Sequence, residues 1–440
     1  MLSSNTQIIA DITGGSSTAD VKFEGIYTDT RKAGKGKLFI ALEGDSFDGH
    51  DFVQHAEDAG AKAVISHKEL TTSLPTITVG NTEEAYRTIA SWYRQLFSPI
   101  VIAITGSNGK TSTKNMLANI LSIAAPTLCT QGNLNNHLGV PQTLLNINKE
   151  HKYCVIEMGA NHVNEISLLC HLVKPTFAII TNANNAHLGE FGSIDNLVKA
   201  KGEIIGALPE NGVALINADS PHKSAWEKTA GNRNCVLFGN NTAIFATNIV
   251  EKKGLLQFNL HCNNETTQVT LRMIGKHQVE NALAATACAT QLGIDISDIK
   301  QGLELTASEQ GRLNLLHCRG FTILDDSYNA NPHSMKAAID TLTSYSGEKI
   351  AVLGSMAELG DKSSELHRDI GVYARQNSVD EVYTIGDDAK HYQGHQFDDI
   401  ESLFQHLRKH HSNATILIKG SRLMQLDKLV NLFTKTANSA

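Results

Sequence analysis

Apolar residues along the 440-residue chain gather in short runs, which polar and glycine-containing segments separate. A short apolar run bounded by turn residues predicts a buried strand, whereas apolar positions three and four residues apart predict one face of a helix. Residues 100–104 form such a run, and Met116, Leu117, Ile120 and Leu121 follow with the helical spacing. The pattern therefore predicts a strand, a turn and a helix in succession.

The same alternation continues towards the C-terminus. Further strands are predicted at residues 154–157, 177–181, 213–217, 322–324, 349–353, 381–385 and 415–418. Helices are predicted at residues 279–292, 334–345 and 363–375. Strands that alternate with helices are typical of α/β domains built on a mainly parallel sheet, and we expect this fold class.

The chain divides into three predicted domains. Residues 1–98 hold short extended segments and a helix predicted at residues 83–97. That helix is expected to end before Pro99, because the residue that precedes a proline disfavours the helical conformation. Two blocks with the strand–helix rhythm follow, and a loop ending at Gly311-Arg312 separates them. We therefore predict domains at residues 1–98, 99–313 and 314–440.

Composition and charge exclude several classes of protein. Hydrophobic residues make up 41% of the chain and charged residues 19%, which is typical of a globular protein. The apolar runs are far shorter than the roughly 20 residues that span a bilayer, and no secretory signal is visible, so we expect a cytoplasmic protein without a membrane span. Seven cysteines without a Cys-x-x-Cys pair indicate reduced thiols. A net charge of −7 without a basic run disfavours a nucleic-acid partner.

A glycine-containing turn links the predicted strand at residues 100–104 to the helix that follows. Glycines let backbone N–H groups converge, and the start of a helix adds unpaired N–H groups, so this turn suits a phosphate. Lys110 can reach the terminal phosphates of a nucleotide, and the Thr111 hydroxyl can hold Mg²⁺. Ile104 stands where the full Walker A pattern has its first glycine, and a chance glycine-rich turn is the alternative. The predicted ATP-binding loop is Thr105-Gly106-Ser107-Asn108-Gly109-Lys110-Thr111.

This loop and several later segments resemble the Mur ligase family, whose compact phosphate loop has the pattern Gly-x-x-Gly-Lys-Thr. The later segments appear in the family's order over nearly the whole chain. They are residues 156–161 with Glu157, Asn184-Asn185-Ala186-His187-Leu188, Lys199-Ala200-Lys201-Gly202-Glu203, Gly275-Lys276-His277, residues 281–285, Gly311-Arg312 and residues 325–332. The resemblance implies a three-domain architecture: an N-terminal UDP-sugar-binding domain, a central P-loop ATPase-like domain with a parallel sheet, and a C-terminal Rossmann-like domain.

Some segments are similar to particular members of the family. Residues 325–332, 354–360 and 419–422 resemble the members that add D-Ala-D-Ala. The resemblance implies an ATP-dependent amide ligase of cytoplasmic peptidoglycan precursor synthesis. Such an enzyme converts a carboxylate of UDP-MurNAc-tripeptide into an acyl phosphate, which the amine of D-Ala-D-Ala attacks, and it releases ADP and phosphate. We expect it to act as a monomer.

Oxygen ligands suit the Mg²⁺ that accompanies ATP, and Thr111 and Glu157 offer them. A strand-end carboxylate such as Glu157 is, however, often only solvated. The resemblance implies that two ions bind, that His187 is a ligand of the second, and that an N-carbamoylated Lys201 faces the metals. A structural histidine and a solvated lysine are the alternatives, with Lys199 a near neighbour. The predicted catalytic residues are Lys110, Glu157, His187 and Lys201, and the predicted metal ligands are Thr111, Glu157, His187 and Lys201.

The remaining candidates bind the nucleotide and the substrates. The resemblance implies that Asn281 contacts adenine and that Arg312 contacts the phosphates, which a planar guanidinium suits. Asp326 follows a predicted strand and is expected at the ribose hydroxyls. For the uridine nucleotide the candidates are Asp29, Thr30 and Arg31, and for the muramoyl peptide they are Asn135 and Asn136. Asn329 and Asn331 are expected to line the amine-side cleft, and Lys419 and Arg422 are expected at the carboxylate of the incoming dipeptide. Turn formation is the alternative for the Asp and Asn residues among them.

Other functions remain open at this point. The sister ligase that adds the third amino acid typically carries an Asp-x-Pro-Arg-like motif in its last domain, which this chain lacks. A folylpolyglutamate-type ligase lacks the UDP-sugar domain. A catalytically inactive nucleotide-binding scaffold would not need Lys110, Thr111 and Lys201 together. The pattern does not distinguish meso-diaminopimelate from lysine as the third residue of the tripeptide.

Overall fold

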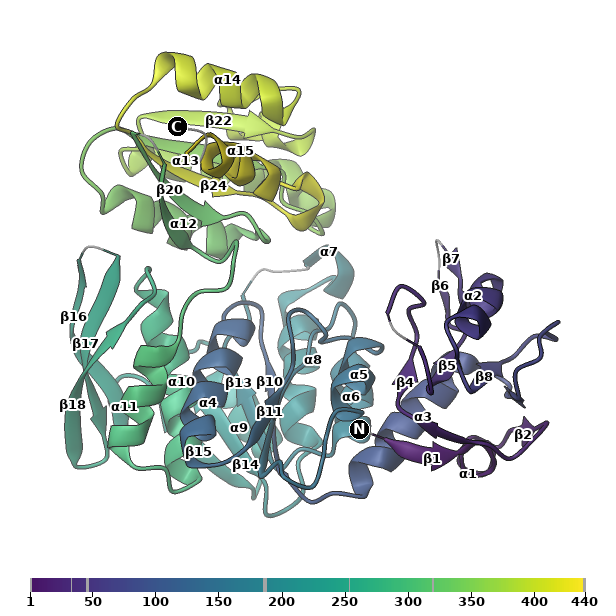
Figure 1. Ribbon diagram of the computed structural model, residues 1–440. Coiled ribbons are helices and arrows are strands. Elements are labelled where there is room, and N and C mark those ends of the chain that lie inside the picture. Colours follow the sequence, from purple (N-terminus) through teal and green to yellow (C-terminus); the bar gives the residue numbers. More distant parts are fainter. Residues whose placement is uncertain are drawn as a thin grey trace. The chain divides into compact units, whose positions relative to one another are not determined.

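The computed structural model describes residues 2–32, 34–44, 47–184, 188–252, 254–318 and 320–437 (Figure 1). The chain forms two compact units. The first contains the chain up to Ala103 together with Ala125–Gly159 and Glu165–Thr176, and the second contains Ile104–Ala124, Ala160–Asn164 and Phe177–Ala440. The division falls within one strand, β10 (Ile100–Thr105).

The N-terminal part of the first unit is built on a five-stranded sheet. Its strand order is β2 (Ser16–Ser17), β9 (Thr76–Thr78), β8 (Ala63–Ser66), β5 (Leu38–Ile40) and β4 (Ile26–Tyr27). β4, β5, β8 and β9 pair in parallel, and β2 is antiparallel to β9. The helices α1 (Thr6–Thr13), α2 (Val53–Asp58) and α3 (Thr82–Gln95) accompany this sheet. The predicted helix at residues 83–97 is confirmed, and Asn81 begins it by accepting a hydrogen bond from the Glu84 N–H.

Smaller elements complete this part of the unit. β1 (Ser3–Asn5) pairs with β3 (Lys22–Glu24), and β6 (Glu43–Gly44) pairs with β7 (Phe47–Asp48), both antiparallel. A short 3₁₀ helix, η1 (Gly49–Phe52), follows β7. These elements place the charged side chains of Glu43 and Asp48 next to each other along the chain's surface, because Glu43 and Asp48 are partners in the β6–β7 register.

The first unit also contains part of a parallel sheet in the order β11-β12-β10. β11 (Thr127–Cys129) and β12 (Tyr153–Glu157) pair in parallel. The helices α5 (Gly139–Leu144) and α6 (Glu165–Val173) both pack against α3. Glu157 is the last residue of β12, which the apolar pattern predicts at residues 154–157.

The second unit begins with the end of β10, where the Thr181 N–H donates to the Thr105 carbonyl. β13 (Phe177–Ile180), β14 (Val213–Asn217) and β15 (Asn234–Phe238) follow side by side and in parallel, which confirms the strands predicted at residues 177–181 and 213–217. The accompanying helices are α4 (Lys110–Ala124), α7 (Leu188–Phe191), α8 (Ile194–Gly206) and α9 (Lys223–Ala230). Trp226 of α9 is buried and donates from Nε1 to the Val198 carbonyl of α8, at 3.1 Å.

A three-stranded antiparallel sheet extends the second unit. It consists of β16 (Ile244–Lys252), β17 (Leu255–Cys262) and β18 (Glu265–Leu271). The helices α10 (His277–Gln291) and α11 (Ile296–Leu305) follow, and both pack against α4. α10 confirms the helix predicted at residues 279–292, whereas the three-stranded sheet was not predicted.

The last part of the second unit is a six-stranded sheet in the order β19-β20-β24-β21-β22-β23. The strands are β19 (Asn314–Cys318), β20 (Phe321–Asp326), β21 (Lys349–Gly354), β22 (Glu381–Ile385), β23 (His395–Phe397) and β24 (Thr415–Lys419), and only β19 runs antiparallel to its described neighbour. α12 (Pro332–Thr343) and α13 (Ser363–Gln376) pack into one core, and α14 (Ile400–His410) and α15 (Asp427–Ala437) pack into another (Figure 1). The predicted strands and helices of this part are confirmed, and helices on both faces of a mainly parallel sheet make it Rossmann-like.

Within the described residues, no helix is both long and apolar enough to cross a membrane.

Candidate active site

The phosphate loop lies between β10 and α4 in the second unit, and residues after β13 hold it in place. Asn182 Oδ1 accepts from the Asn108 N–H at 2.9 Å, and the Thr181 hydroxyl donates to the Asn108 carbonyl at 2.6 Å. The Ser107 hydroxyl donates to the Asn184 carbonyl at 2.9 Å. The loop conformation is therefore fixed by backbone and side-chain contacts from the neighbouring strand end, and not by the loop residues alone.

Gly109 is required by a close approach within this loop. Its φ of +79° lies in the left-handed region, which disfavours residues with a side chain. A Cβ at this position would also overlap the side-chain amide of Asn281 on α10. Asn281 is buried and donates from Nδ2 to Gln278 Oε1 at 2.9 Å. The structure thus brings Asn281, a predicted adenine contact, against the phosphate loop.

Lys110 is the first residue of α4, and its ammonium lies over its own loop. Nζ donates to the Gly106 carbonyl at 2.6 Å and to the Ser107 carbonyl at 3.2 Å. Thr111 is buried directly after it. The first N–H groups of a helix lack partners within the helix, so the start of α4 adds donors for an anion beside the Lys110 charge.

The two lysines that sequence alone leaves in competition occupy different environments on α8. Lys201 is 2% exposed, its Nζ lies 3.5 Å from the Ala160 carbonyl, and Nζ is 5.5 Å from the centre of the Phe191 ring. Lys199, by contrast, is exposed. Lys201 is therefore not an ordinary solvated helix lysine, and burial favours it over Lys199 as the functional residue.

Glu157 is 1% exposed at the end of β12 in the first unit. Asn135 Nδ2 donates to Glu157 Oε1 at 2.7 Å, and the Glu157 N–H donates to the Thr130 hydroxyl at 3.0 Å. The carboxylate is thus buried and oriented, and the solvated-carboxylate alternative does not hold. Asn136 accepts from the N–H groups of Leu138 and Gly139 at the start of α5.

The predicted metal ligands are distributed over both units. Glu157 belongs to the first unit, and Thr111 and Lys201 belong to the second. His187 lies outside the residues that the structure describes. Glu157 in the first unit and both Thr111 and Lys201 in the second unit are buried.

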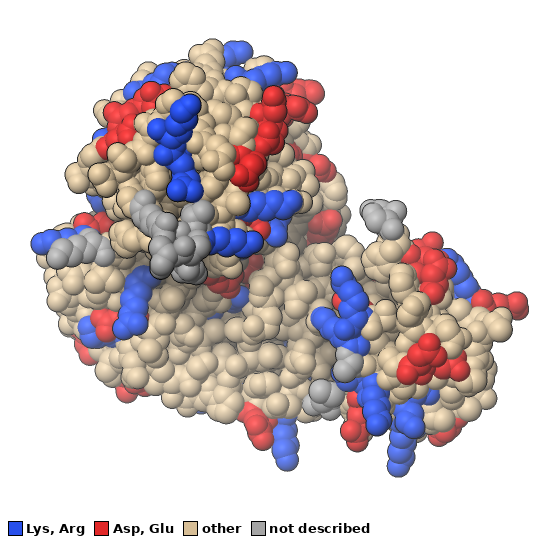
Figure 2. Space-filling view, turned by 45° about the horizontal axis from the view of Figure 1, so that its top comes forward, with Lys and Arg blue, Asp and Glu red and all other residues tan. Residues whose placement is uncertain are grey.

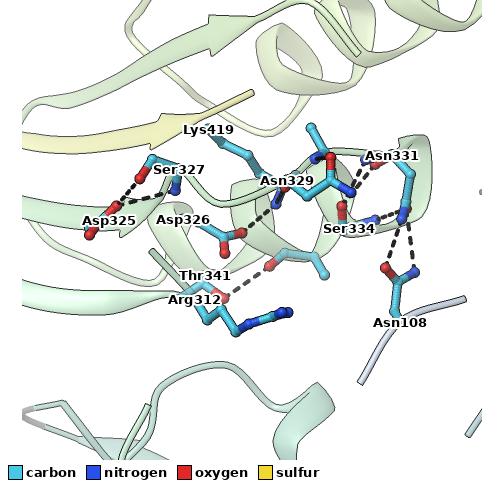
Figure 3. Close-up of polar contacts among 12 residues, drawn as sticks. Asn108, Arg312, Asp325, Asp326, Ser327, Asn329, Asn331, Ser334, Thr341 and Lys419 are labelled. Atoms are coloured by element: carbon cyan, nitrogen blue, oxygen red, sulfur yellow. Dashed lines mark hydrogen bonds and ion pairs between the residues drawn. The ribbon is translucent and has the colours of Figure 1, made fainter. Parts of the chain in front are cut away.

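The carboxyl ends of β20 and β24 carry a cluster of polar side chains (Figure 3). Lys419 is 2% exposed and its Nζ donates to Asp326 Oδ2 at 2.6 Å and to the Asn329 carbonyl at 2.8 Å. The neighbouring Asp325 is buried and accepts from the Ser327 hydroxyl at 2.6 Å and from the Gly311 N–H at 3.2 Å. Burial raises the pKa of the Asp325 carboxyl above its usual value.

Asn331 connects this cluster to the phosphate loop. The two side-chain amides are reciprocally hydrogen-bonded, Asn331 Nδ2 to Asn108 Oδ1 at 2.7 Å and Asn108 Nδ2 to Asn331 Oδ1 at 3.3 Å (Figure 3). The Asn331 side chain also accepts from the Ser334 N–H and so begins α12. The structure therefore brings together Asn108, which the sequence predicts at the nucleotide, and Asn331, which it predicts at the amine substrate.

Arg312 packs against the same part of the unit. Its guanidinium carbon lies 4.1 Å from the centre of the Tyr328 ring, a cation–π distance, and Nε lies 3.7 Å from Glu309 Oε2. Glu309 also accepts from Asn115 Nδ2 at 2.8 Å and lies 3.6 Å from Lys114 Nζ, both on α4. Arg312 is thus positioned by aromatic and acidic neighbours and is not a loose surface residue.

His277 begins α10 beside these groups. Burial lowers the pKa of its imidazole to about 4, with Asp326 opposing the change and Lys419 and His333 adding to it. A neutral imidazole therefore lies close to the Asp326–Lys419 pair.

The sequence candidates at the two ends of the chain are more exposed. Asp29 Oδ1 and Oδ2 accept from Arg31 Nε and Nη2 at 2.9 and 2.8 Å, and this hydrogen bonding lowers the pKa of the Asp29 carboxyl to about 2. Thr30 lies between these two residues. Arg422 is exposed, with Nη1 3.4 Å from Asp427 Oδ1. Basic and acidic side chains are interspersed on the face shown in Figure 2, as a net charge of only −7 leads one to expect.

The sequence interpretation missed several residues that position the site. Asn182 and Thr181 hold the phosphate loop, and Glu309 links Arg312 to α4. The signal for Asn182 was available, because it follows directly on the apolar run of β13, where α/β proteins place ligand-binding side chains. Glu309 carries no such signal, since its partner Asn115 on α4 lies 194 positions away along the chain.

Three family models match consecutive parts of the chain. "Mur ligase family, catalytic domain" matches residues 22–91, "Mur ligase middle domain" matches 104–289, and "Mur ligase, glutamate ligase domain" matches 311–422. The chain is 39% identical to the UDP-N-acetylmuramoyl-tripeptide--D-alanyl-D-alanine ligase of Escherichia coli (strain K12), over 98% of each chain. The chain belongs to the Mur ligase family.

Solved Mur ligase structures share the whole fold. A crystal structure of MurF from Acinetobacter baumannii has a TM-score of 0.93, with 35% sequence identity over 99% of each chain. MurF ligase from Thermotoga maritima, solved in complex with ADP, has a TM-score of 0.84 with 29% identity, covering 93% of this chain and 97% of that one. The predicted Mur ligase resemblance and three-domain α/β architecture are thereby confirmed. The domain boundaries after residues 98 and 313 and the roles of single residues stay predictions.

Proposed function

We propose that this Mur ligase joins D-Ala-D-Ala to UDP-MurNAc-tripeptide in peptidoglycan precursor synthesis, with conversion of ATP to ADP and phosphate. The observation that carries the proposal is the similarity, over 98% of the chain, to the UDP-N-acetylmuramoyl-tripeptide--D-alanyl-D-alanine ligase of Escherichia coli. A similarity that covers the nucleotide loop and also the N- and C-terminal regions extends to the parts that would bind the two substrates. It favours this reaction over addition of the third amino acid and over a scaffold without catalysis.

The nucleotide would bind at the start of α4. Phosphoryl transfer to a carboxylate depends on positioning and on neutralising charge. In the proposed mechanism, the Lys110 ammonium leaves the loop carbonyls and meets the phosphates of ATP together with the loop N–H groups. Asn281 contacts the adenine and Arg312 the phosphates, while Asp326 accepts from the ribose hydroxyls. The acyl phosphate that forms is the electrophile for the incoming amine.

Mg²⁺ fits the candidate ligands by their chemistry. Thr111 offers a hydroxyl and Glu157 a carboxylate, which are the hard oxygen donors that this ion prefers. When bound, Mg²⁺ would neutralise charge on the phosphates during transfer. We propose that Lys201 is N-carbamoylated and that it serves, with His187, as a ligand of a second ion. The burial of Lys201, in contrast to the exposed Lys199 on the same helix, supports a special role for Lys201.

The substrate-binding assignments are refined by the contacts of each side chain. Lys419 was expected at the carboxylate of the dipeptide, but its ammonium is buried against Asp326. We therefore propose that Lys419 orients Asp326, and that the exposed Arg422 binds the dipeptide carboxylate. Asn329 and Asn331 line the amine side. For the UDP-linked peptide we propose Asp29, Thr30 and Arg31 at the uridine nucleotide, and Asn135 and Asn136 at the muramoyl peptide.

Cellular location and assembly follow from the proposed reaction. ATP and UDP-linked precursors are made and used in the cytoplasm, so we propose that the enzyme acts there. We propose a monomer, since each substrate can be assigned to residues of one chain.

A substrate panel tests the proposal. The purified full chain receives ATP, Mg²⁺ and one member of a series of UDP-MurNAc-peptides of increasing length. The acceptor is either D-Ala-D-Ala or a single amino acid, glutamate included. Phosphate release is expected only when UDP-MurNAc-tripeptide and D-Ala-D-Ala are both present. Release with the dipeptide substrate and a single amino acid would instead identify the sister ligase. Tripeptides ending in meso-diaminopimelate or in lysine then determine the third residue.

A further inference from the structure

Three potential metal ligands meet in the N-terminal part of the first unit, in a place that the proposed reaction does not use. Glu43 lies in β6, His50 in η1, and His67 follows β8. One ligand atom from each of these side chains lies within 4.8 Å of the others. His67 Nε2 and Glu43 Oε2 are 3.2 Å apart. Two imidazoles and one carboxylate are a donor set typical of zinc.

Each histidine has an outer partner for the nitrogen that faces away from the group. Asp48 Oδ1 lies 2.5 Å from His50 Nδ1, and the Thr82 hydroxyl lies 3.5 Å from His67 Nδ1. A carboxylate that accepts from Nδ1 keeps the proton there and leaves Nε2 as a lone-pair donor. Metal-binding histidines in proteins characteristically have such an outer hydrogen bond, which fixes the tautomer and the ring orientation.

His50 provides a second, independent indication of a ligand. Its side chain is only 4% exposed, and its Nε2 has no hydrogen-bond partner within the part of the chain that the structure describes. A buried polar atom without a partner is costly, so such an atom needs an explanation. The rings of His50 and His67 are nearly perpendicular, with centroids 4.5 Å apart. A cation shared by both rings would satisfy the buried nitrogen.

We propose that Glu43, His50 and His67 bind a divalent transition-metal ion of the zinc type, with Asp48 orienting His50. Imidazole nitrogens favour Zn²⁺ over Mg²⁺, which prefers oxygen ligands, so this site differs in chemistry from the one assigned to Mg²⁺. The ion would tie together β6, η1 and the end of β8. The metal site does not depend on the proposed ligase reaction.

Lys68 provides an internal competitor for the ion. Its Nζ lies 3.1 Å from Glu43 Oε2 and 2.5 Å from Asp48 Oδ2, so the ammonium lies where it would repel a second cation. The Lys68 side chain is 41% exposed and can move into solvent. Replacing its charge while keeping its stem, in Lys68→Met, should therefore strengthen metal binding severalfold.

The test uses Co²⁺ as a spectroscopic substitute for Zn²⁺ with the full chain in saturating Mg²⁺, which occupies oxygen sites. The wild type should bind one equivalent of Co²⁺ with the visible absorption of a tetrahedral site, and Zn²⁺ should abolish that absorption. His67→Gln should lose this absorption, because the change removes one of the three ligands. The variant should still fold, because His67 is only partly buried and can be replaced without disturbing the core. His410→Gln, an exposed histidine on α14, is the matched control and should keep the absorption.

A second readout avoids reliance on the spectrum. Zn²⁺ should raise the thermal unfolding midpoint of the wild type and of His410→Gln, but not that of His67→Gln, whose fold circular dichroism would verify. The proposal is overturned if the wild type shows no tetrahedral Co²⁺ absorption, if His67→Gln retains it, or if His410→Gln loses it. Unchanged or weaker binding by Lys68→Met would also contradict the assignment, because the ammonium would then not border the ion.

Discussion

Lys419 and Asp326 are direct partners in the parallel register of β24 and β20, and their side chains form an ion pair with 2.6 Å between Nζ and Oδ2. Each is the last residue of its strand. Two adjacent strand ends thereby hold a charge pair, with Lys419 buried and Asp326 partly buried, at the edge of the sheet where ligands bind in Rossmann-like folds. The charge of Lys419 is consequently paired within the protein, with the carboxylate of Asp326.

Removing one member of this pair should destabilise the fold more than removing both. Lys419→Met leaves Asp326 without its partner, and we expect a loss of about 2–3 kcal/mol in the free energy of unfolding. Adding Asp326→Asn removes the uncompensated charge and should restore part of that loss. Urea denaturation followed by circular dichroism measures both variants. A Lys419→Met variant as stable as the wild type would show that the pair contributes nothing.

Lys110→Ala should lose ATP turnover while keeping its fold. The ammonium is a point charge placed to meet charge that develops on the transferred phosphoryl group, so we expect at least about a 100-fold lower kcat. Phosphate release with both substrates measures it, and Lys149→Ala at an exposed position serves as the control. Near-wild-type release by Lys110→Ala would mean that the phosphate loop is wrongly assigned.

Lys201→Ala and Lys199→Ala should differ clearly in ligase activity. Lys201 is buried and Lys199 exposed on the same helix, so only Lys201→Ala should reduce activity, by about 100-fold or more. A short carboxylate such as acetate should partly restore it, since a free anion can replace the proposed carbamate. Equal losses in the two variants would contradict the assignment. A density map of the active, substrate-bound enzyme with an unmodified Lys201 would rule out the carbamate.

His277 should make stability fall with acidification. Burial lowers its pKa in the folded protein to about 4 from the ordinary 6.5, so the unfolded chain takes up a proton first as the pH falls. The stability that neutral His277 contributes is complete above pH 6.5 and is lost as the pH falls towards about 4. The unfolding midpoint should therefore drop further between about pH 7 and pH 5 in the wild type than in His277→Gln. Parallel pH profiles would contradict this.

The elements predicted best from sequence are those buried on both faces. β14 and β22 match their predicted residues at both ends, because each is rich in apolar and β-branched residues and has a glycine next to it, Gly212 before β14 and Gly386 after β22. β17 was missed although its buried residues alternate with more exposed ones. After Leu255 its more exposed positions are polar, so the apolar residues do not form a continuous run and short-range patterns do not single the strand out.

The candidate site divides in the same way. The phosphate loop could be predicted because its glycines, Lys110 and Thr111 are consecutive, and their chemistry follows from local spacing. The contacts of Asn108 could not, because its partners lie 74 residues away at Asn182 and 223 residues away at Asn331. Such pairs arise only when the chain has folded, and a residue whose role depends on them has no signature in its own neighbourhood.

The position of Trp226 gives the chain an intrinsic optical reporter. The protein has two tryptophans, and they fall in different units: Trp226 is buried in α9 against α8, whereas Trp92 is half-buried in α3. In Trp92→Phe, all remaining tryptophan fluorescence would come from the helix pair that carries Lys201. The emission of that single indole, and its quenching by acrylamide, would therefore follow the packing of α8 during a titration with ATP, without any attached label.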